Sequence, residues 1–169
     1  MEEQEKILIE GRVKIENQVK AGTSWFFWIA GLSLVNSIIL LSGGNWNFVI
    51  GLGVTQIIDT LGIQLAEKIG IIGNVIAFIF DIGAAGIFIL FGIFSKKKYS
   101  WAFIVGMGLY AFDGLLFLLA KDLLSIGFHI FALSCIWSGF KANKLLTKTE
   151  NSNIIPNYQP VIGEQKSSA

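Results

Sequence analysis

The chain has 169 residues, of which 53% are hydrophobic and 15% are charged, and its net charge at pH 7 is +1. Soluble domains carry roughly 25% charged residues, so this composition excludes an ordinary soluble domain and indicates a polytopic membrane protein. The near-neutral charge offers no basic surface for nucleic acid. With one cysteine, Cys135, and one histidine, His129, an intrachain disulfide and a cysteine-rich metal site are excluded, and we expect no metal and no cofactor.

The N-terminal segment, residues 1–22, alternates Glu and Lys and carries apolar residues at loosely helical spacing. It has no apolar stretch of the kind found in cleavable signal peptides, so we interpret it as an amphipathic segment that leads into the membrane. The hydroxyls of Thr23 and Ser24 are well placed to cap the first membrane helix.

The membrane domain is predicted to cover residues 23–145, followed by a polar, disordered tail over 146–169. The fold class is therefore all-α, a polytopic membrane helix bundle with five hydrophobic helices, of which four or five span the bilayer. The helices are expected at about 24–42, 47–66, 70–95, 99–120 and 123–145.

An internal similarity suggests a duplicated two-helix unit. Trp46–Gly53 (WNFVIGLG) aligns with Trp101–Gly108 (WAFIVGMG), and one gap further on Asp59 meets Asp113. If the repeat is real, the second helix spans the membrane as the fourth does, which makes five spans.

The positive-inside rule favours a different count. It places Lys96–Lys98 and the C-terminal tail on the cytoplasmic side of the cell membrane. Five spans then put the N-terminus, with Arg12, outside, against the rule. If the stretch 48–65 is instead interfacial or re-entrant, there are four spans and an inside N-terminus. The repeat favours five spans, and both topologies stay open on the sequence.

Ionisable residues inside the predicted spans are the candidate functional site, because each costs roughly 2.5–3.5 kcal/mol on insertion scales. Counting residues from the loops places them at about one level in the outer half of the membrane. Asp113 and His129 are the pair that we most expect to meet, because a tight hairpin joins their helices. The candidates are Asp59, Asp81, Asp113 and His129, with Asn36, Gln56 and Asn74 as secondary members.

Such a polar layer could bind a cation, relay protons, or hold the bundle together by hydrogen bonds. The first reading predicts a multi-pass membrane protein with ion- or proton-coupled small-solute transport or a channel-like activity. The alternative is a non-catalytic membrane scaffold or accessory subunit of a membrane complex. The expected partners are the lipid bilayer and either a second copy or a membrane partner protein, without nucleic acid. An enzyme is disfavoured, since the sequence offers no catalytic residues that we can assign.

Overall fold

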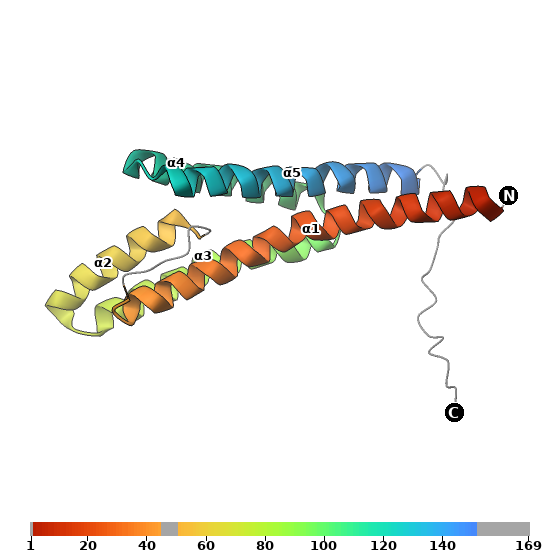
Figure 1. The fold of residues 1–169 in the computed structure, drawn as a ribbon. Coiled ribbons are helices and arrows are strands. Elements are labelled where there is room, and N and C mark those ends of the chain that lie inside the picture. Colours follow the sequence, from red (N-terminus) through yellow and green to blue (C-terminus); the bar gives the residue numbers. More distant parts are fainter. Residues whose placement is uncertain (1, 45–50, 152–169) are drawn as a thin grey trace, which may run out of the picture.

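The computed structural model describes residues 2–44 and 51–151. Within these residues the chain is all-helical and contains five helices, which confirms the predicted fold class (Figure 1). They are α1 (Glu2–Leu41), α2 (Gly53–Ile69), α3 (Ile72–Lys96), α4 (Ser100–Ala120) and α5 (Leu123–Asn151). Four of the described helices, α1, α3, α4 and α5, are long and apolar enough to cross a membrane. Large apolar side chains are exposed along them, as lipid-facing surfaces require.

The N-terminal segment and the first span form one continuous helix, α1. The expected cap at Thr23–Ser24 is wrong, because the Ser24 hydroxyl donates to the carbonyl of Lys20 inside the helix, at 2.8 Å. Glu and Lys are strong helix formers, and charge pairs four residues apart, such as Arg12 and Glu16 at 3.0 Å, support the helix further. The charged segment is therefore helical as well, and α1 continues without interruption from it into the apolar span.

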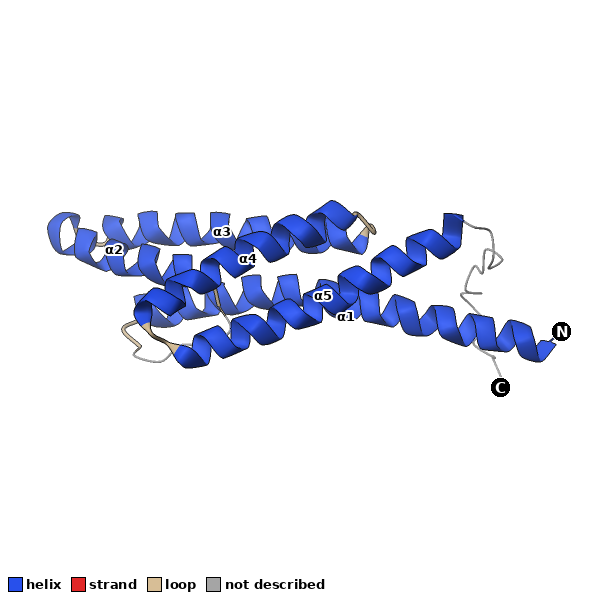
Figure 2. Ribbon diagram, turned by 90° about the horizontal axis from the view of Figure 1, so that it is seen from above, coloured by secondary structure: helices blue, strands red, loops and turns tan. Residues whose placement is uncertain are grey.

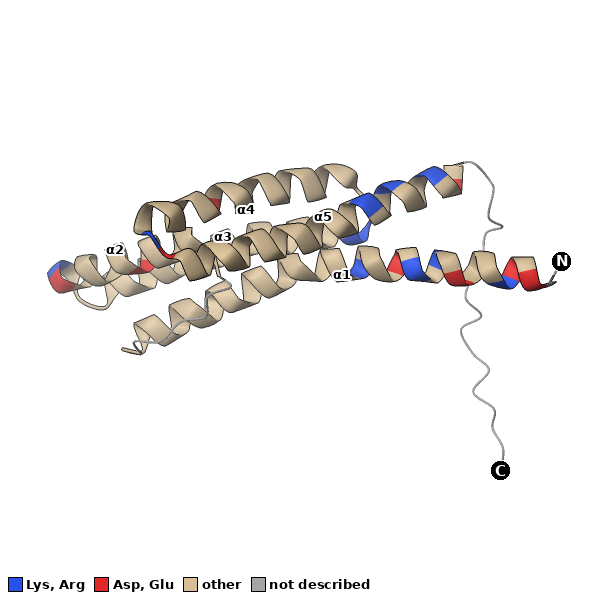
Figure 3. Ribbon diagram, turned by 45° about the horizontal axis from the view of Figure 1, so that its top comes forward, with Lys and Arg blue, Asp and Glu red and all other residues tan. Residues whose placement is uncertain are grey.

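The four long helices alternate in direction, so that the N-terminus, the α3–α4 loop and the end of α5 lie at one end of the bundle (Figure 1). Glu150 ties these segments together, because its Oε1 atom accepts from Lys98 at 2.6 Å and from Arg12 at 3.3 Å. Figure 3 shows basic and acidic residues concentrated towards the ends of the bundle, while the middle is almost free of them. We call the end that contains Glu150 the basic end.

Helix α2 differs from the helix that the repeat predicted. It begins at Gly53 inside the bundle and runs in the same direction as α1 (Figure 1). Its start lies at the level of Ser33, two turns before α1 ends at Leu41. With 17 residues, α2 is not among the described helices long enough to cross a membrane. The four-span topology matches this arrangement, whereas the fifth span is not supported; residues 45–50 of the repeat lie outside the described residues.

Two pairs of glycines set the helix packing. A Cβ on Gly22 would lie 2.6 Å from the Cα of Gly139, so α1 and α5 cross with their backbones in contact. Beyond this crossing the two helices diverge (Figure 2). Gly62 and Gly73 allow a similarly close approach of α2 and α3, because a Cβ at either position would clash with the other helix. Close approach through small residues is the usual packing device between membrane helices.

An aromatic core fills the half of the bundle nearer the basic end. Phe26 contacts Phe88 and Phe103, with ring centroids 6.5 Å and 6.1 Å apart. Two turns further from the basic end, the same inward faces become polar, with Ser33 on α1 and Asp81 on α3. The candidate site therefore lies between the aromatic core and the opposite end of the bundle.

Candidate functional site

The carboxylate of Asp113 binds the buried start of α2. Its Oδ2 accepts the backbone N–H of Gly53 at 2.8 Å, and its Oδ1 accepts that of Val54 at 2.9 Å. The first amides of a helix have no partner within the helix, and a side-chain oxygen at the N-cap usually satisfies one of them. Leu52 occupies the N-cap and has no such oxygen. Asp113, 60 residues away on α4, supplies the cap and the negative charge that a helix N-terminus favours.

Helix α1 holds the same helix start from the other side. The backbone N–H of Leu52 donates to the Ser33 hydroxyl at 2.8 Å, and that hydroxyl donates to the carbonyl of Ile29 at 2.7 Å. Thr55 closes the first turn by donating its hydroxyl to the Leu52 carbonyl at 2.8 Å. The start of α2 is therefore fixed between α1 and α4 by hydrogen bonds in a buried environment.

His129 of α5 completes this cluster. Its Nδ1 lies 2.9 Å from the carbonyl oxygen of Ser125, which can only accept, so Nδ1 carries a hydrogen. Its Nε2 lies 3.1 Å from Asp113 Oδ2. A hydrogen bond between these two atoms needs one proton, on either the imidazole or the carboxyl group.

Aromatic rings enclose the His129 imidazole. Tyr110 stacks on it, with ring centroids 4.2 Å apart and an interplanar angle of 16°, and Phe117 lies at 5.0 Å. Gly114 leaves room for the ring, because a Cβ there would lie 3.2 Å from its Cδ2 atom. His129 is 2% exposed and Asp113 is 6% exposed. Electrostatic contacts are stronger in such a dry environment than in water.

A second pair of acidic residues lies between α2 and α3. Asp59 is 1% exposed and Asp81 is fully buried. The Asp81 side chain faces Asp59 and the hydroxyl of Ser37, which comes from α1. Within the described residues, no hydrogen bond of ordinary geometry reaches either oxygen of Asp81, Oδ1 of Asp59, or the hydroxyl of Ser37. Three helices thus direct these buried oxygens towards one another, and Asp81 interacts with both the Asp59 carboxyl group and the Ser37 hydroxyl.

The structure thus places the four predicted site residues in two neighbouring pairs. Asp59 lies six residues after Gly53, or about 9 Å along α2. The expected contact between Asp113 and His129 is present.

The secondary residues surround the two pairs. Asn36 is buried, and its side-chain amide lies next to Gly51 at the approach to α2. Gln56 is half-buried, one turn before Asp59. Asn74 is also half-buried, two turns before Asp81 on α3, and its Oδ1 is buried without a hydrogen-bond partner among the described residues.

Sequence reasoning missed three residues that build the site: Ser33, Ser37 and Tyr110. Ser33 and Ser37 lie four residues apart, which is one face of a helix, in a mostly apolar span that also contains Asn36. That spacing was a usable signal for a polar face on α1. Tyr110 lies one turn before Asp113 and could have been included for the same reason.

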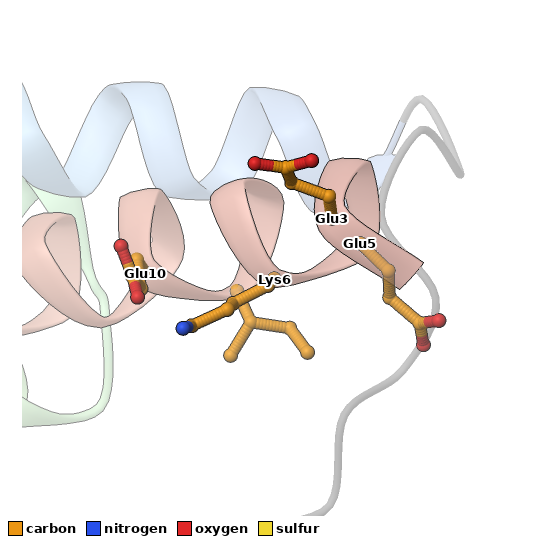
Figure 4. Close-up of a pocket in the computed structure, with 5 residues that line it drawn as sticks. Glu3, Glu5, Lys6 and Glu10 are labelled. Carbon is orange, nitrogen blue, oxygen red and sulfur yellow. The ribbon is translucent and has the colours of Figure 1, made fainter. Parts of the chain in front are cut away.

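A surface hollow on the projecting part of α1 is a poor alternative site. It is lined by Glu3, Glu5, Lys6, Ile9 and Glu10, all from one helix. Figure 4 shows Glu3 and Glu5 pointing in different directions. The hollow is thus one exposed, charged face of a helix, without a second element to hold a ligand.

Among the described residues, no group of three or more His, Cys, Asp or Glu side chains could hold a metal ion. Comparison with protein-family models, curated proteins and solved structures finds no match for the chain. Functional inference therefore depends on the two buried pairs and on the apolar helices, which support a location in a membrane.

Proposed function

We propose that the protein transports protons or a small cation across a membrane, with Asp59 and Asp81 as the binding pair. The observation that carries this proposal is the position of Asp81, fully buried and facing a second carboxyl group without hydrogen-bond partners for its own oxygens. A buried carboxylate normally has a hydrogen-bond donor or a positive partner.

The electrostatics of the pair supports ion handling. Two carboxylates that face each other in an apolar interior cannot both stay ionised without positive charge between them. Among the described residues, no ion pair links Asp59 or Asp81 to a basic side chain. A proton or a cation from solution is the remaining source of positive charge.

Helix α2 provides a second argument. A short helix that starts inside the bundle and leaves at the end where α1 terminates is the arrangement of a re-entrant segment. Transporters commonly build ion sites near interrupted helices at membrane depth. Asp59 lies on such a segment, so a small movement of α2 would change the distance between the two carboxyl groups.

The proposal includes the orientation of the helix bundle in the membrane. The basic end carries Lys96, Lys97 and Lys98 as well as the lysines at the end of α5. The positive-inside rule therefore assigns this end, with both the N-terminus and the end of α5, to the cytoplasm. The binding pair then lies in the outer half of the membrane.

Flux measurements in liposomes test the proposal. Purified protein is reconstituted with a pH-sensitive dye inside the vesicles, and a gradient of protons or of Na⁺ is applied. We expect flux above that of protein-free vesicles, and we expect Asp81→Asn and Asp59→Asn to reduce it to the background. Asp122→Asn is the matched control, because it removes an exposed carboxyl group from the α4–α5 turn.

The outcome separates the proposed function from its alternative. Unchanged flux in both Asp81→Asn and Asp59→Asn would overturn the proposal. If the wild type conducts nothing, and the same substitutions instead lower thermal stability or abolish co-purification with a membrane protein, the result supports a scaffold or accessory subunit.

A further inference from the structure

We infer that Ser37, Asp59 and Asp81 form a binding site for one Na⁺ ion, which exchanges with one proton. This inference rests on the proposed function and names its ion. The site lies where α1, α2 and α3 meet, and each helix contributes one of the three side chains.

Four oxygen atoms make up the site. They are the hydroxyl of Ser37, one carboxyl oxygen of Asp59 and both carboxyl oxygens of Asp81, and each is buried without a hydrogen bond of ordinary geometry among the described residues. Ser37 and Asp81 are fully buried, and Asp59 is 1% exposed. More than about 90% of buried polar groups in proteins are satisfied, so four unsatisfied oxygens at one place require an explanation.

The chemistry of these oxygens favours a hard, singly charged cation. Carboxylate and hydroxyl oxygens are hard ligands and exclude metals that prefer sulfur or imidazole. Ca²⁺ takes about 6–8 oxygen ligands, and Mg²⁺ requires a near-ideal octahedron. Four protein oxygens in an apolar interior fall short of both, whereas a small monovalent cation needs less compensation for its lost hydration.

Charge balance sets the stoichiometry. Two neutral states are available to the pair: both carboxyl groups protonated, or one protonated and the other ionised beside Na⁺. Conversion of the first state into the second releases one proton and takes up one Na⁺. The net charge stays constant, so the membrane voltage does not drive the exchange at this site.

Titratable groups on the neighbouring helices do not change the charge balance of the Asp59–Asp81 pair. On α4, Tyr110 and Asp113 are the buried titratable groups, and on α5 the corresponding group is His129. Asp113 and His129 are bonded to each other, and Tyr110 stacks on His129. Helix α1 contributes uncharged groups at this level, Ser37 and Asn36. The proton exchanged for Na⁺ therefore comes from Asp59 or Asp81.

Proton release on sodium binding tests the inference directly. Wild-type protein in weakly buffered detergent solution is titrated with NaCl, and with KCl and choline chloride for comparison. We expect NaCl to release about one proton per chain, because binding of a cation displaces the proton of its ligand. An absence of proton release, or an equal release with KCl, would overturn the inference without the need for any variant.

Removal of the Ser37 hydroxyl tests whether Na⁺ binds at this position. Ser37→Ala leaves both carboxyl groups in place, and we expect it to weaken the apparent Na⁺ affinity about tenfold or more, about 1.4 kcal/mol. The control is Ser134→Ala, which removes an exposed hydroxyl bonded to the Phe131 carbonyl in α5. Equal Na⁺ affinity of folded Ser37→Ala and the wild type would refute this site.

The liposome assay distinguishes the two proposals. Proton flux that requires Asp81 but does not respond to Na⁺ would overturn the sodium site and leave the proposed transport function standing. Absence of both proton and Na⁺ flux in the wild type would overturn both.

Discussion

His129 Nε2 lies 3.1 Å from Asp113 Oδ2, while the other ring nitrogen of His129 donates to the Ser125 carbonyl. The same carboxyl group caps α2 through Gly53 and Val54. One side chain thus connects α5 to the only described helix whose N-terminus lies inside the bundle. This connection implies that Asp113 and His129 position α2, the helix that carries Asp59 of the proposed ion site.

Replacement of the capping carboxylate should destabilise the protein. In Asp113→Asn, the side chain keeps one acceptor oxygen, so one backbone amide of α2 loses its partner. We expect a loss of about 1–3 kcal/mol, more than the ~0.6 kcal/mol average for polar pairs between spans. Thermal unfolding in detergent measures it against the wild type. A melting temperature equal to that of the wild type would show that the cap contributes nothing.

The proton on Nδ1 of His129 can be observed directly, because the chain contains one histidine. Protein labelled with ¹⁵N-histidine gives signals from this ring alone. We expect Nδ1 to be protonated and bonded to the Ser125 carbonyl. A ring protonated at Nε2 alone would contradict the hydrogen bond from Nδ1 to the Ser125 carbonyl.

The topology can be measured by labelling single cysteines in a Cys135→Ser background. Gly11 and Lys97 are exposed near the basic end, and Ile71 is 77% exposed in the turn between α2 and α3. We expect cysteines at positions 11 and 97 to react with an impermeant reagent from one side of the membrane, and a cysteine at position 71 from the other. Reaction of positions 11 and 97 from opposite sides would rule out the four-span topology.

The crossing of α1 and α5 should not tolerate a side chain. Gly139→Leu would push the two backbones apart at Gly22, and overpacking of this kind costs typically about 1–3 kcal/mol. Gly127→Leu is the matched control on the same helix, because no atom lies within 4 Å of a Cβ at that position. Thermal unfolding should show a lower melting temperature for Gly139→Leu alone.

Acid should weaken the start of α5. Hydrogen bonds from the hydroxyl and the backbone N–H of Ser125 hold the pKa of Asp122 below its ordinary value of 3.8. The Asp122 carboxyl group therefore binds a proton more readily in the unfolded chain than in the folded protein. Its stabilisation is complete above the ordinary pKa of 3.8 and is lost as the pH falls through the lower folded-state pKa. We expect Ser125→Ala to raise the pKa of Asp122 towards 3.8, as measured by NMR titration. An unchanged pKa would refute the role of Ser125.

Sequence patterns were sufficient for the helices that cross the bundle. The predicted ranges 70–95 and 99–120 match Ile72–Lys96 and Ser100–Ala120 closely, because long apolar runs end at charged turns. The pattern was misleading for α1, where a charged segment and an apolar span form one helix. Amphipathic and apolar sequences can both be helical, so a change in composition does not mark a helix end.

The buried ionisable residues could be predicted from the sequence, but their arrangement could not. Rare charges in apolar spans identified Asp59, Asp81, Asp113 and His129, because each of them costs free energy in a membrane. Residue counting could compare their depths along the helices. It could not show that Asp113 caps α2, since its partners are backbone amides, which every residue except proline has.

By itself, the sequence determined the membrane setting, the helical class and the rarity of buried charge, because these follow from local hydrophobicity and helix length. Only the tertiary structure decided where α2 begins and how the carboxyl groups are paired. The physical reason is that a helix start inside an apolar bundle needs an acceptor from another helix. Asp113 has that role, while Asp59 and Asp81 face each other near Ser37.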